Sequence, residues 1–351
     1  MRGYIHKLGL LLLSAALALQ LSACGSAPAP SPTPEPTPAP QATATPSPGP
    51  NADAMNDSGF LREDIDSFTT TDDLDREVTF TARPERVAIL TGSFADVWCL
   101  AGGKDTIVAA ADDTWTQFDL GLPDTVERLG AIKEPNLEVL LAVEPDLVIA
   151  SAKTEAAVAL LPTLEAAGIP VLYYDISNVQ DYLDMLSACT ALTGQRENYD
   201  QYGLAVMEQI EQARDRARAH TGEPETVLYV RATGSTCKVK NSQTVVLGEM
   251  LADLGTVNIA DSADALLEEL SMEVILASDP DKIFIVMQGS DQEKVQNTLE
   301  QSLISNPAWQ QLTAVQDGEV YYMDQALYNV KPNARWGEAY EGLADILYGE
   351  E

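Results

Sequence analysis

The chain has 351 residues, with 54 acidic side chains against 21 lysines and arginines, and its formal net charge is −33. So large a negative charge argues against a nucleic-acid-binding protein, because the phosphate backbone requires a basic surface. The chain holds only two histidines, His6 and His220. His6 lies in the N-terminal segment that is expected to be removed, so a multi-histidine zinc or manganese site is excluded and only His220 could serve a Ser-His-Asp triad. The sequence contains neither a dinucleotide-binding glycine fingerprint nor a phosphate-binding loop.

The first 23 residues have the features of a secretory signal. Arg2 and Lys7 precede an apolar run over residues 8–19, which is too short to span a bilayer stably. The next residues, Leu-Ser-Ala-Cys at 21–24, resemble a bacterial lipobox, which implies cleavage and lipidation of Cys24. Several acyl chains anchor a protein firmly. We therefore expect a lipid anchor on the extracytoplasmic face of the cell membrane.

Residues 24–75 are expected to form a tether. Half of the 20 prolines lie within residues 25–50, and this composition favours an extended polyproline conformation over a packed core. Residues 51–75 are acidic and weakly patterned. Folding is therefore predicted to begin at Arg76, and the roughly 275 residues that follow exceed one comfortable core, so two domains are expected.

Short apolar segments alternate with helical segments from Arg86 to Asp175, which predicts a parallel α/β sheet. Strands are expected at 86–90, 106–111, 146–151 and 171–175, and helices at 94–102, 136–143 and 157–168, the last broken near Pro162. The pattern restarts at Glu225. Strands are expected there at 226–232, 282–288 and 319–324, and helices at 245–255, 273–278 and 335–349.

A helix at 179–192, ended by Gly194, precedes a charged stretch at 197–220 without proline. This stretch could form a helix of roughly 36 Å, either packed on one domain or linking two. Its place between the two alternating regions favours a link. The predicted fold is α/β, with two similar lobes of parallel-rich sheet, at 76–194 and 222–351, joined by one long helix at 195–221.

One twelve-residue segment occurs twice. Residues 138–149 read EVLLAVEPDLVI and residues 273–284 read EVILASDPDKIF, with identical residues at six of the twelve positions. A small polar residue, Asn136 or Ser271, stands two places before each glutamate, so each copy predicts an N-cap, a short helix, a Pro-Asp turn and a buried strand. A repeat at so long an offset indicates two similar lobes.

The chain resembles the ABC-importer substrate-binding lipoproteins for ferric siderophores, cobalamin and haem. The resemblance rests on the two repeated segments, on PERVAIL and LEAAGIPVLYYD, and on the end segment from Asn306 onward. The resemblance implies a two-lobed, non-enzymatic receptor with a single interlobe helix. Its expected partners are a small metal chelate or tetrapyrrole and an ABC permease dimer with its ATPase. It also implies that Glu138 and Glu273 dock against arginines of the permease. Complementing the helix N-terminus is the simpler role for each glutamate, but it does not account for two at equivalent places.

Ligands of parallel α/β sheets bind beyond the carboxyl ends of the strands. That rule selects polar, aromatic and sulfur-bearing side chains after six strands: Ser93, Trp115, Ser151, Lys153, Arg231, Lys238, Met287, Tyr328, Arg335 and Trp336. The basic residues among them, with Lys240 and Lys331, suit carboxylate or hydroxamate oxygens. Trp115 and Trp336 could stack on a flat ligand, and Met287 or Tyr328 could be an axial haem ligand.

The three cysteines of the processed chain, Cys99, Cys189 and Cys237, match no zinc or redox spacing, and no disulfide framework is expected. We expect no protein-bound metal, no cofactor and a monomer. Two alternative functions remain, an orphan sensor or adhesion lipoprotein with the same fold and a surface enzyme. The scarcity of histidine and of paired cysteines argues against the enzyme.

Overall fold

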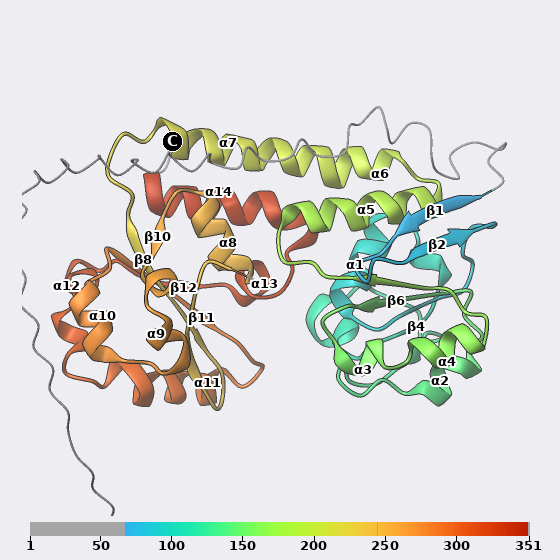
Figure 1. The fold of residues 1–351 in the computed structure, drawn as a ribbon, viewed down its shortest axis with the longest axis horizontal. Coiled ribbons are helices and arrows are strands. Elements are labelled where there is room, and N and C mark those ends of the chain that lie inside the picture. Colours follow the sequence, from blue (N-terminus) through green and yellow to red (C-terminus); the bar gives the residue numbers. More distant parts are fainter. Residues whose placement is uncertain (1–66, 244, 350–351) are drawn as a thin grey trace, which may run out of the picture. The chain divides into compact units, whose positions relative to one another are not determined.

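The computed structural model describes residues 67–243 and 245–349. The predicted signal, Cys24 and most of the predicted tether lie outside these residues. Within them, no helix combines the length and the apolar character that crossing a bilayer requires. Figure 1 shows the fold, with strands and helices alternating along the chain.

The fold begins earlier than Arg76. Strand β1 (Phe68–Thr71) pairs antiparallel with β2 (Glu77–Phe80). Asp72, 3% exposed, accepts hydrogen bonds from the backbone N–H groups of Leu74, Arg76 and Tyr173. The bond from Tyr173 attaches the hairpin to the N-terminal lobe. This corrects the predicted boundary, because residues that read as the end of an acidic tether include a strand and a buried carboxylate.

The N-terminal lobe contains a five-stranded sheet in the order β5-β4-β3-β6-β7, and all its strand pairs are parallel. The strands are β3 (Val87–Ile89), β4 (Ile107–Ala110), β5 (Glu127–Arg128), β6 (Leu147–Ser151) and β7 (Val171–Tyr174). The helical segments are α1 (Gly92–Leu100), η1 (Lys104–Thr106), η2 (Thr114–Phe118), α2 (Leu137–Ala142), α3 (Glu155–Val158) and α4 (Leu161–Ala166). The predicted break near Pro162 is confirmed, since this proline lies in the first turn of α4.

Both faces of this sheet are buried. Val87 and Ile89 pack in one apolar cluster with residues of α1 and of α5 (Val179–Thr193). Ala88 packs in a second cluster with residues of α2, α3 and α4. Burial on both faces accounts for the nearly continuous apolar runs of the strands in the sequence.

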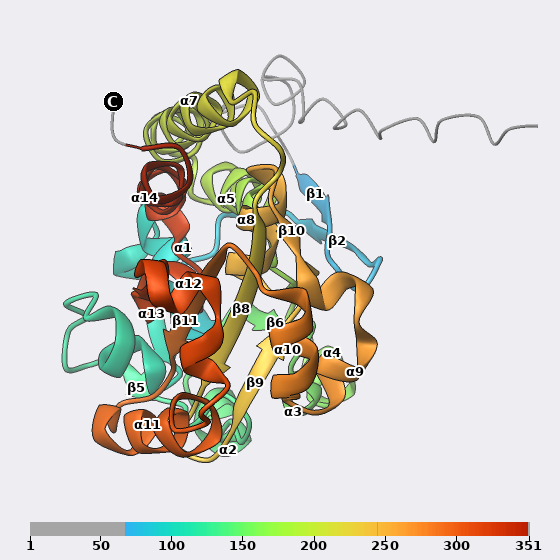
Figure 2. The same ribbon diagram turned by 90° about the vertical axis from the view of Figure 1, so that its left-hand side faces the viewer.

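The connection between the lobes is helical. Helix α5 begins with a capping box at Asn178 and ends at Gly194, which has φ +71°. After a short turn follow α6 (Glu197–Tyr199), the π-helical segment η3 (Asp200–Leu204) and α7 (Ala205–Ala219). The predicted linking helix is thus present, with one π-helical interruption. In Figures 1 and 2, α7 lies beside the C-terminal helix α14 (Trp336–Tyr348).

The C-terminal lobe has the sheet order β10-β8-β11-β12, all parallel, with β9 antiparallel to β8. The strands are β8 (Thr226–Ala232), β9 (Cys237–Lys240), β10 (Val257–Asn258), β11 (Lys282–Met287) and β12 (Val320–Met323). The remaining helical segments are α8 (Val246–Asp253), η4 (Ile259–Ser262), α9 (Asp264–Glu268), α10 (Met272–Ser278), α11 (Gln292–Leu299), η5 (Glu300–Ile304), η6 (Trp309–Gln311), α12 (Thr313–Asp317), α13 (Gln325–Tyr328) and η7 (Asn333–Arg335). The short strands β9 and β10 were not predicted.

The repeated segment forms the same helix–strand unit in both lobes. The first copy forms α2 and β6, and the second forms α10 and β11. The Asn136 side chain accepts a hydrogen bond from the Val139 N–H at 3.1 Å, and Ser271 accepts one from the Val274 N–H at 3.4 Å. These bonds confirm both predicted N-caps.

The turn after each helix is also repeated. Glu144 and Asp279 occupy equivalent positions, and both have left-handed φ angles, 45° and 40°. The aspartate of each Pro-Asp pair then accepts backbone N–H bonds from the neighbouring strand. Asp146 binds the Arg86 N–H at 2.9 Å, and Asp281 binds the Thr226 N–H at 2.7 Å. Each copy of the repeat is therefore hydrogen-bonded to a neighbouring strand through this aspartate.

One apolar cluster extends through both lobes. It includes Val87 and Ile89 of the first sheet, Tyr229 and Phe284 of the second, and residues of α5, α7 and α14. Arg216 of α7 also pairs with Asp345 of α14 at 2.7 Å. The lobes are thus joined by packed side chains as well as by the chain itself.

Candidate ligand-binding cleft

A cavity of about 730 Å³ is lined by residues of both lobes. Asp96 of α1 and residues 116–118 of η2 line it from the N-terminal lobe. From the C-terminal lobe the lining residues follow β11 and β12: Gln288, Gly289, Ser290, Gln325, Ala326, Asn329, Val330, Lys331, Pro332 and Arg335. The cavity therefore lies beyond the carboxyl ends of parallel strands, where such folds bind ligands.

On the N-terminal side, polar groups cluster where β3 and β4 end. Asp113 accepts a hydrogen bond from the Gly92 N–H at 2.8 Å, and burial raises the pKa of its carboxyl group. Among the described residues, the other Asp113 oxygen and the hydroxyls of Thr91 and Thr114 are buried without a hydrogen-bond partner. Buried polar groups normally have partners. This edge therefore has unused hydrogen-bonding capacity.

Lys331 lines the cavity on the segment after α13. Burial lowers the pKa of its ammonium group, while Asp175 and Asp113 of the N-terminal lobe act in the opposite direction. The lysine thus couples electrostatically to carboxylates of the opposite lobe. Of the residues beyond the last strand, it is the one whose predicted place in the cleft has the clearest structural support.

Asn333 joins the two lobes beside this cavity, since its neighbour Pro332 and its partner Asp96 both line it. Its side chain is fully buried, and its Nδ2 atom donates hydrogen bonds of 2.8 Å to the Ser93 carbonyl and to Asp96 Oδ2. Its φ of +53° is left-handed, a conformation in which asparagine is one of the few tolerated residues. Burial raises the pKa of Asp96, and the bond from Asn333 partly offsets this rise.

The predicted basic residues have different environments. Arg335 lines the cavity but is exposed, and it forms a bidentate pair with Glu338 at 2.6 and 2.7 Å. Arg231 donates to Asn329 Oδ1 at 3.1 Å, and Asn329 lines the cavity. Lys238 is exposed on β9, opposite Arg231. Lys153 is exposed and pairs with Asp175 at 2.9 Å.

Tyr328 and Trp336 belong to the core and not to the cleft, which corrects their prediction as ligand contacts. Tyr328 is 5% exposed, and its hydroxyl donates to the Ala339 carbonyl. Burial raises the pKa of its phenol to about 12. Trp336 is 1% exposed. After β12 the chain turns through α13 and η7, so that Tyr328 contacts the C-terminal helix α14 and Trp336, its first residue, is buried in the same apolar cluster.

The other predicted contacts lie at the cleft margin or in the core. Trp115 of η2 is partly buried, and the Arg128 guanidinium stacks over its ring at 4.2 Å. Ser93 is 3% exposed, and it offers its backbone carbonyl to Asn333. Ser151 accepts a hydrogen bond from the Lys153 N–H, and Met287 packs against the second apolar cluster. None of these four is among the residues that line the cavity.

Asp96, Asn329 and Asn333 were not predicted as site residues. No sequence signal marks Asn333, because its position depends on a left-handed backbone and on the opposite lobe. For Asp96 the strand-end rule came close, since it selected Ser93, three residues earlier in α1. In η2 the rule selected only Trp115, which directly precedes the residues 116–118 that line the cavity.

Glu138 and Glu273 are exposed in the first turns of α2 and α10. Within the described part of the chain, neither carboxylate forms a hydrogen bond or an ion pair. The docking role that the resemblance implies requires such free, equivalently placed charges.

The three cysteines are free thiols in the described structure. Burial raises the pKa of Cys99 to about 12 and that of Cys237 to about 11, and it also raises the pKa of the fully buried Cys189. The described residues include no group of three or more His, Cys, Asp or Glu side chains that could hold a metal ion.

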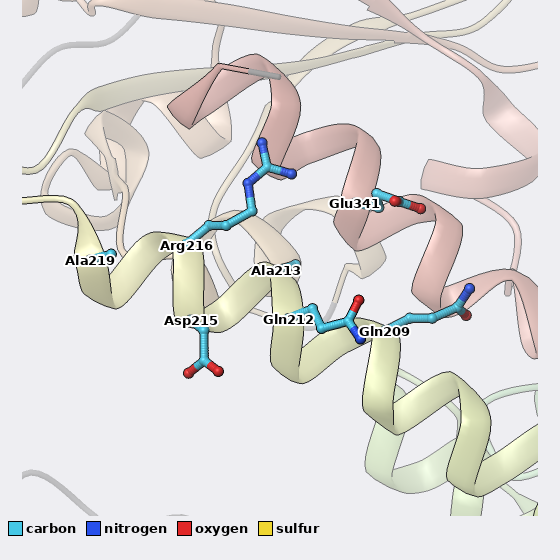
Figure 3. Close-up of a pocket in the computed structure, with 7 residues that line it drawn as sticks. All are labelled: Gln209, Gln212, Ala213, Asp215, Arg216, Ala219 and Glu341. Atoms are coloured by element: carbon cyan, nitrogen blue, oxygen red, sulfur yellow. The ribbon is translucent and has the colours of Figure 1, made fainter. Parts of the chain in front are cut away.

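A second groove, of about 430 Å³, lies between α7 and α14 (Figure 3). Its lining residues are Gln209, Gln212, Ala213, Asp215, Arg216, Ala219 and Glu341. It is formed by helices alone and is remote from the strand ends, and its Arg216 already pairs with Asp345. The interlobe cavity is therefore the better candidate site.

Two lobes of parallel sheet, a helical link and a cavity lined from both sides define a two-lobed solute-binding protein. Residues 87–327 match the family model described as periplasmic binding protein. The chain belongs to the periplasmic binding protein family.

Individual relatives agree with this assignment. The chain is 25% identical over 281 residues to the Fe(3+)-citrate-binding protein YfmC of Bacillus subtilis, covering 78% of this chain and 83% of that protein. It is 24% identical over 283 residues to a cobalamin-binding protein of Halobacterium salinarum, covering 75% and 71%. The crystal structure of the TroA-like periplasmic binding protein FepB from Veillonella parvula superposes with a TM-score of 0.65 at 18% identity, covering 80% and 90%.

Proposed function

We propose that this protein is an extracytoplasmic receptor that captures an iron chelate, haem or a corrinoid and delivers it to an ABC permease. The observation that carries the proposal is the interlobe cavity, to which Asp96 contributes from one lobe and Lys331 from the other. Its volume of about 730 Å³ lies in the usual range of small-molecule sites. Relatives named for ferric citrate and for cobalamin support this range of cargo.

The mechanism requires capture and release but no bond chemistry. A ligand held between the lobes would use hydrogen-bonding groups at the ends of β3 and β4, together with the cations that follow β8 and β12. The continuous core between the lobes favours a small closure over a wide hinge motion. Delivery then depends on docking of both lobes to a permease, a role we assign to Glu138 and Glu273. We propose that the receptor acts as a monomer.

Ligand-dependent stabilisation tests this function. The domain from Ser67 onward should melt at a higher temperature with one member of a panel of ferric citrate, other ferric chelates, haemin and cobalamin. A ligand present at a hundred times its dissociation constant should add about 2.7 kcal/mol to the free energy of unfolding. A well-folded domain that none of these compounds stabilises would contradict the proposal.

We also propose that Cys24 carries the lipid anchor. Cys24→Ala should abolish lipidation and release the mature protein from the membrane fraction into the medium or periplasm, because a tether without acyl chains has no apolar attachment. Fractionation and immunoblotting would measure this. Ser22→Ala, a neighbouring small-residue change, serves as the control and should stay membrane-bound. Full retention of the Cys24→Ala protein would show that another segment anchors it.

A further inference from the structure

Three cations share one face of the arm formed by β8 and β9. In the antiparallel register, Arg231 lies directly opposite Lys238, and Tyr229 lies opposite Lys240. Directly opposite residues project from the same face of a sheet, as do residues two apart on one strand. Arg231, Lys238 and Lys240 therefore form a basic triad. Figure 2 shows β8 and β9 side by side.

The triad lacks the counterions that this chain could readily supply. The sequence has 54 acidic residues, yet within the described residues none of the three cations forms an ion pair. Arg231 donates instead to the neutral Asn329 side chain. Like charges placed directly opposite each other destabilise a sheet. Partial burial and the charges of Arg231 and Lys238 lower the pKa of Lys240, which is consistent with this repulsion.

The triad reaches the cleft through Arg231. Arg231 is the penultimate residue of β8, near its carboxyl end. Its hydrogen-bond partner Asn329 lines the interlobe cavity. Uncompensated positive charge is thus placed beside the proposed cargo site, in a protein that is otherwise strongly acidic. A local violation of pairing rules of this kind is expected at functional sites.

We propose that the basic triad is the subsite for the anionic part of the cargo, and that the cargo is a multiply charged polycarboxylate metal chelate. This rests on the receptor function proposed above. The Cβ atoms of directly opposite residues lie about 5 Å apart and those of diagonal residues about 7–8 Å apart. Three cations spaced in this way match a ligand with several carboxylates better than a ligand with a single carboxylate. The Arg231 guanidinium suits bidentate carboxylate binding. A corrinoid without such charges would leave the three cations without anionic partners.

Charge removal tests the subsite. Isothermal titration with ferric citrate as the probe would compare the wild type with Lys238→Gln, Lys240→Gln and the double variant. Each single variant should bind about tenfold more weakly and the double variant about a hundredfold, which corresponds to about 1.4 kcal/mol per tenfold. Lys104→Gln is the matched control, because Lys104 lies at the amino-terminal side of β4, and it should bind like the wild type.

Ligand-free stability provides a second readout. Because each substitution removes like-charge repulsion, the triad variants should melt at the same or a higher temperature than the wild type while binding more weakly. Wild-type binding of cobalamin, which has no carboxylate groups, but not of ferric citrate would overturn the polycarboxylate subsite and leave the receptor function intact. Unchanged ferric citrate affinity in the double variant would do the same. Binding of none of the compounds in the full panel, other ferric chelates included, would overturn both proposals.

Discussion

Reversing Glu138 and Glu273 together to arginine should reduce uptake about a hundredfold while leaving ligand affinity in solution unchanged. Both carboxylates are exposed, both stand in the first turn of a short helix, and both belong to the repeated unit. Two matched charges, one on each lobe, can fix orientation and association rate at a permease, and reversal replaces attraction with repulsion. A hundredfold loss corresponds to about 2.7 kcal/mol. Transport of labelled ligand into cells or proteoliposomes would measure it.

The chain offers a closely matched control for this experiment. Glu155 and Glu293 are also exposed glutamates in the first turns of helices, α3 and α11, one in each lobe. Reversing both changes the net charge by the same amount and has the same effect on helix dipoles, about 0.3–1 kcal/mol at each helix. This variant should retain uptake. Equal loss in both double variants would mean that net charge, and not the repeated glutamates, controls docking.

The second large effect is expected at the interlobe contact of Asn333. Asn333→Asp should place a second carboxylate against Asp96 and remove the donor to the Ser93 carbonyl, at a cost of about 3 kcal/mol in the free energy of unfolding at neutral pH. Two carboxylates at hydrogen-bond distance share a proton, so one of the two pKa values rises strongly. Chemical denaturation at pH 7.5 and at pH 5 would measure the cost.

The pH dependence has a definite sign. Burial raises the folded-state pKa of Asp96 above its reference value of 3.8, so the folded state binds protons more readily than the unfolded chain. The resulting destabilisation is complete above the folded pKa and is relieved as the pH falls through it. Asn333→Asp should therefore lose less stability at pH 5 than at pH 7.5. Asp96→Asn, which removes the buried charge and keeps an acceptor for Asn333, should be as stable as the wild type. Equal stability of Asn333→Asp and the wild type at pH 7.5 would contradict the assigned role of this contact.

The repeated unit was predictable because its signals are local. An N-cap at Asn136 or Ser271, an apolar helix and a Pro-Asp turn lie within a dozen residues, and the structure shows each of them in both lobes. The alternation of buried strands and helices likewise predicted the two parallel sheets. The features that were missed depend on distant partners. The first hairpin is attached through Tyr173, about a hundred residues further along the chain.

The candidate site was harder to predict for a similar reason. The strand-end rule identifies where the chain leaves a sheet but not where each side chain points, so it selected Lys331 and Arg335 together with the buried Tyr328 and Trp336. The difference arises from the turn through α13 and η7. The left-handed φ of Asn333 sets the path of this turn and has no signature in the residues around it.

The apolar cluster that extends through both lobes has a consequence for how the chain can be divided. The repeated unit gives the two lobes the same local architecture, but both lobes contribute side chains to one shared cluster. Here α14, the last element of the chain, packs on the interlobe helix α7, and the adjoining Asn333 binds α1 of the first lobe. Neither half can be excised without exposing the apolar surface of the other. Because the two lobes share one apolar cluster, we expect them to unfold together in a single transition.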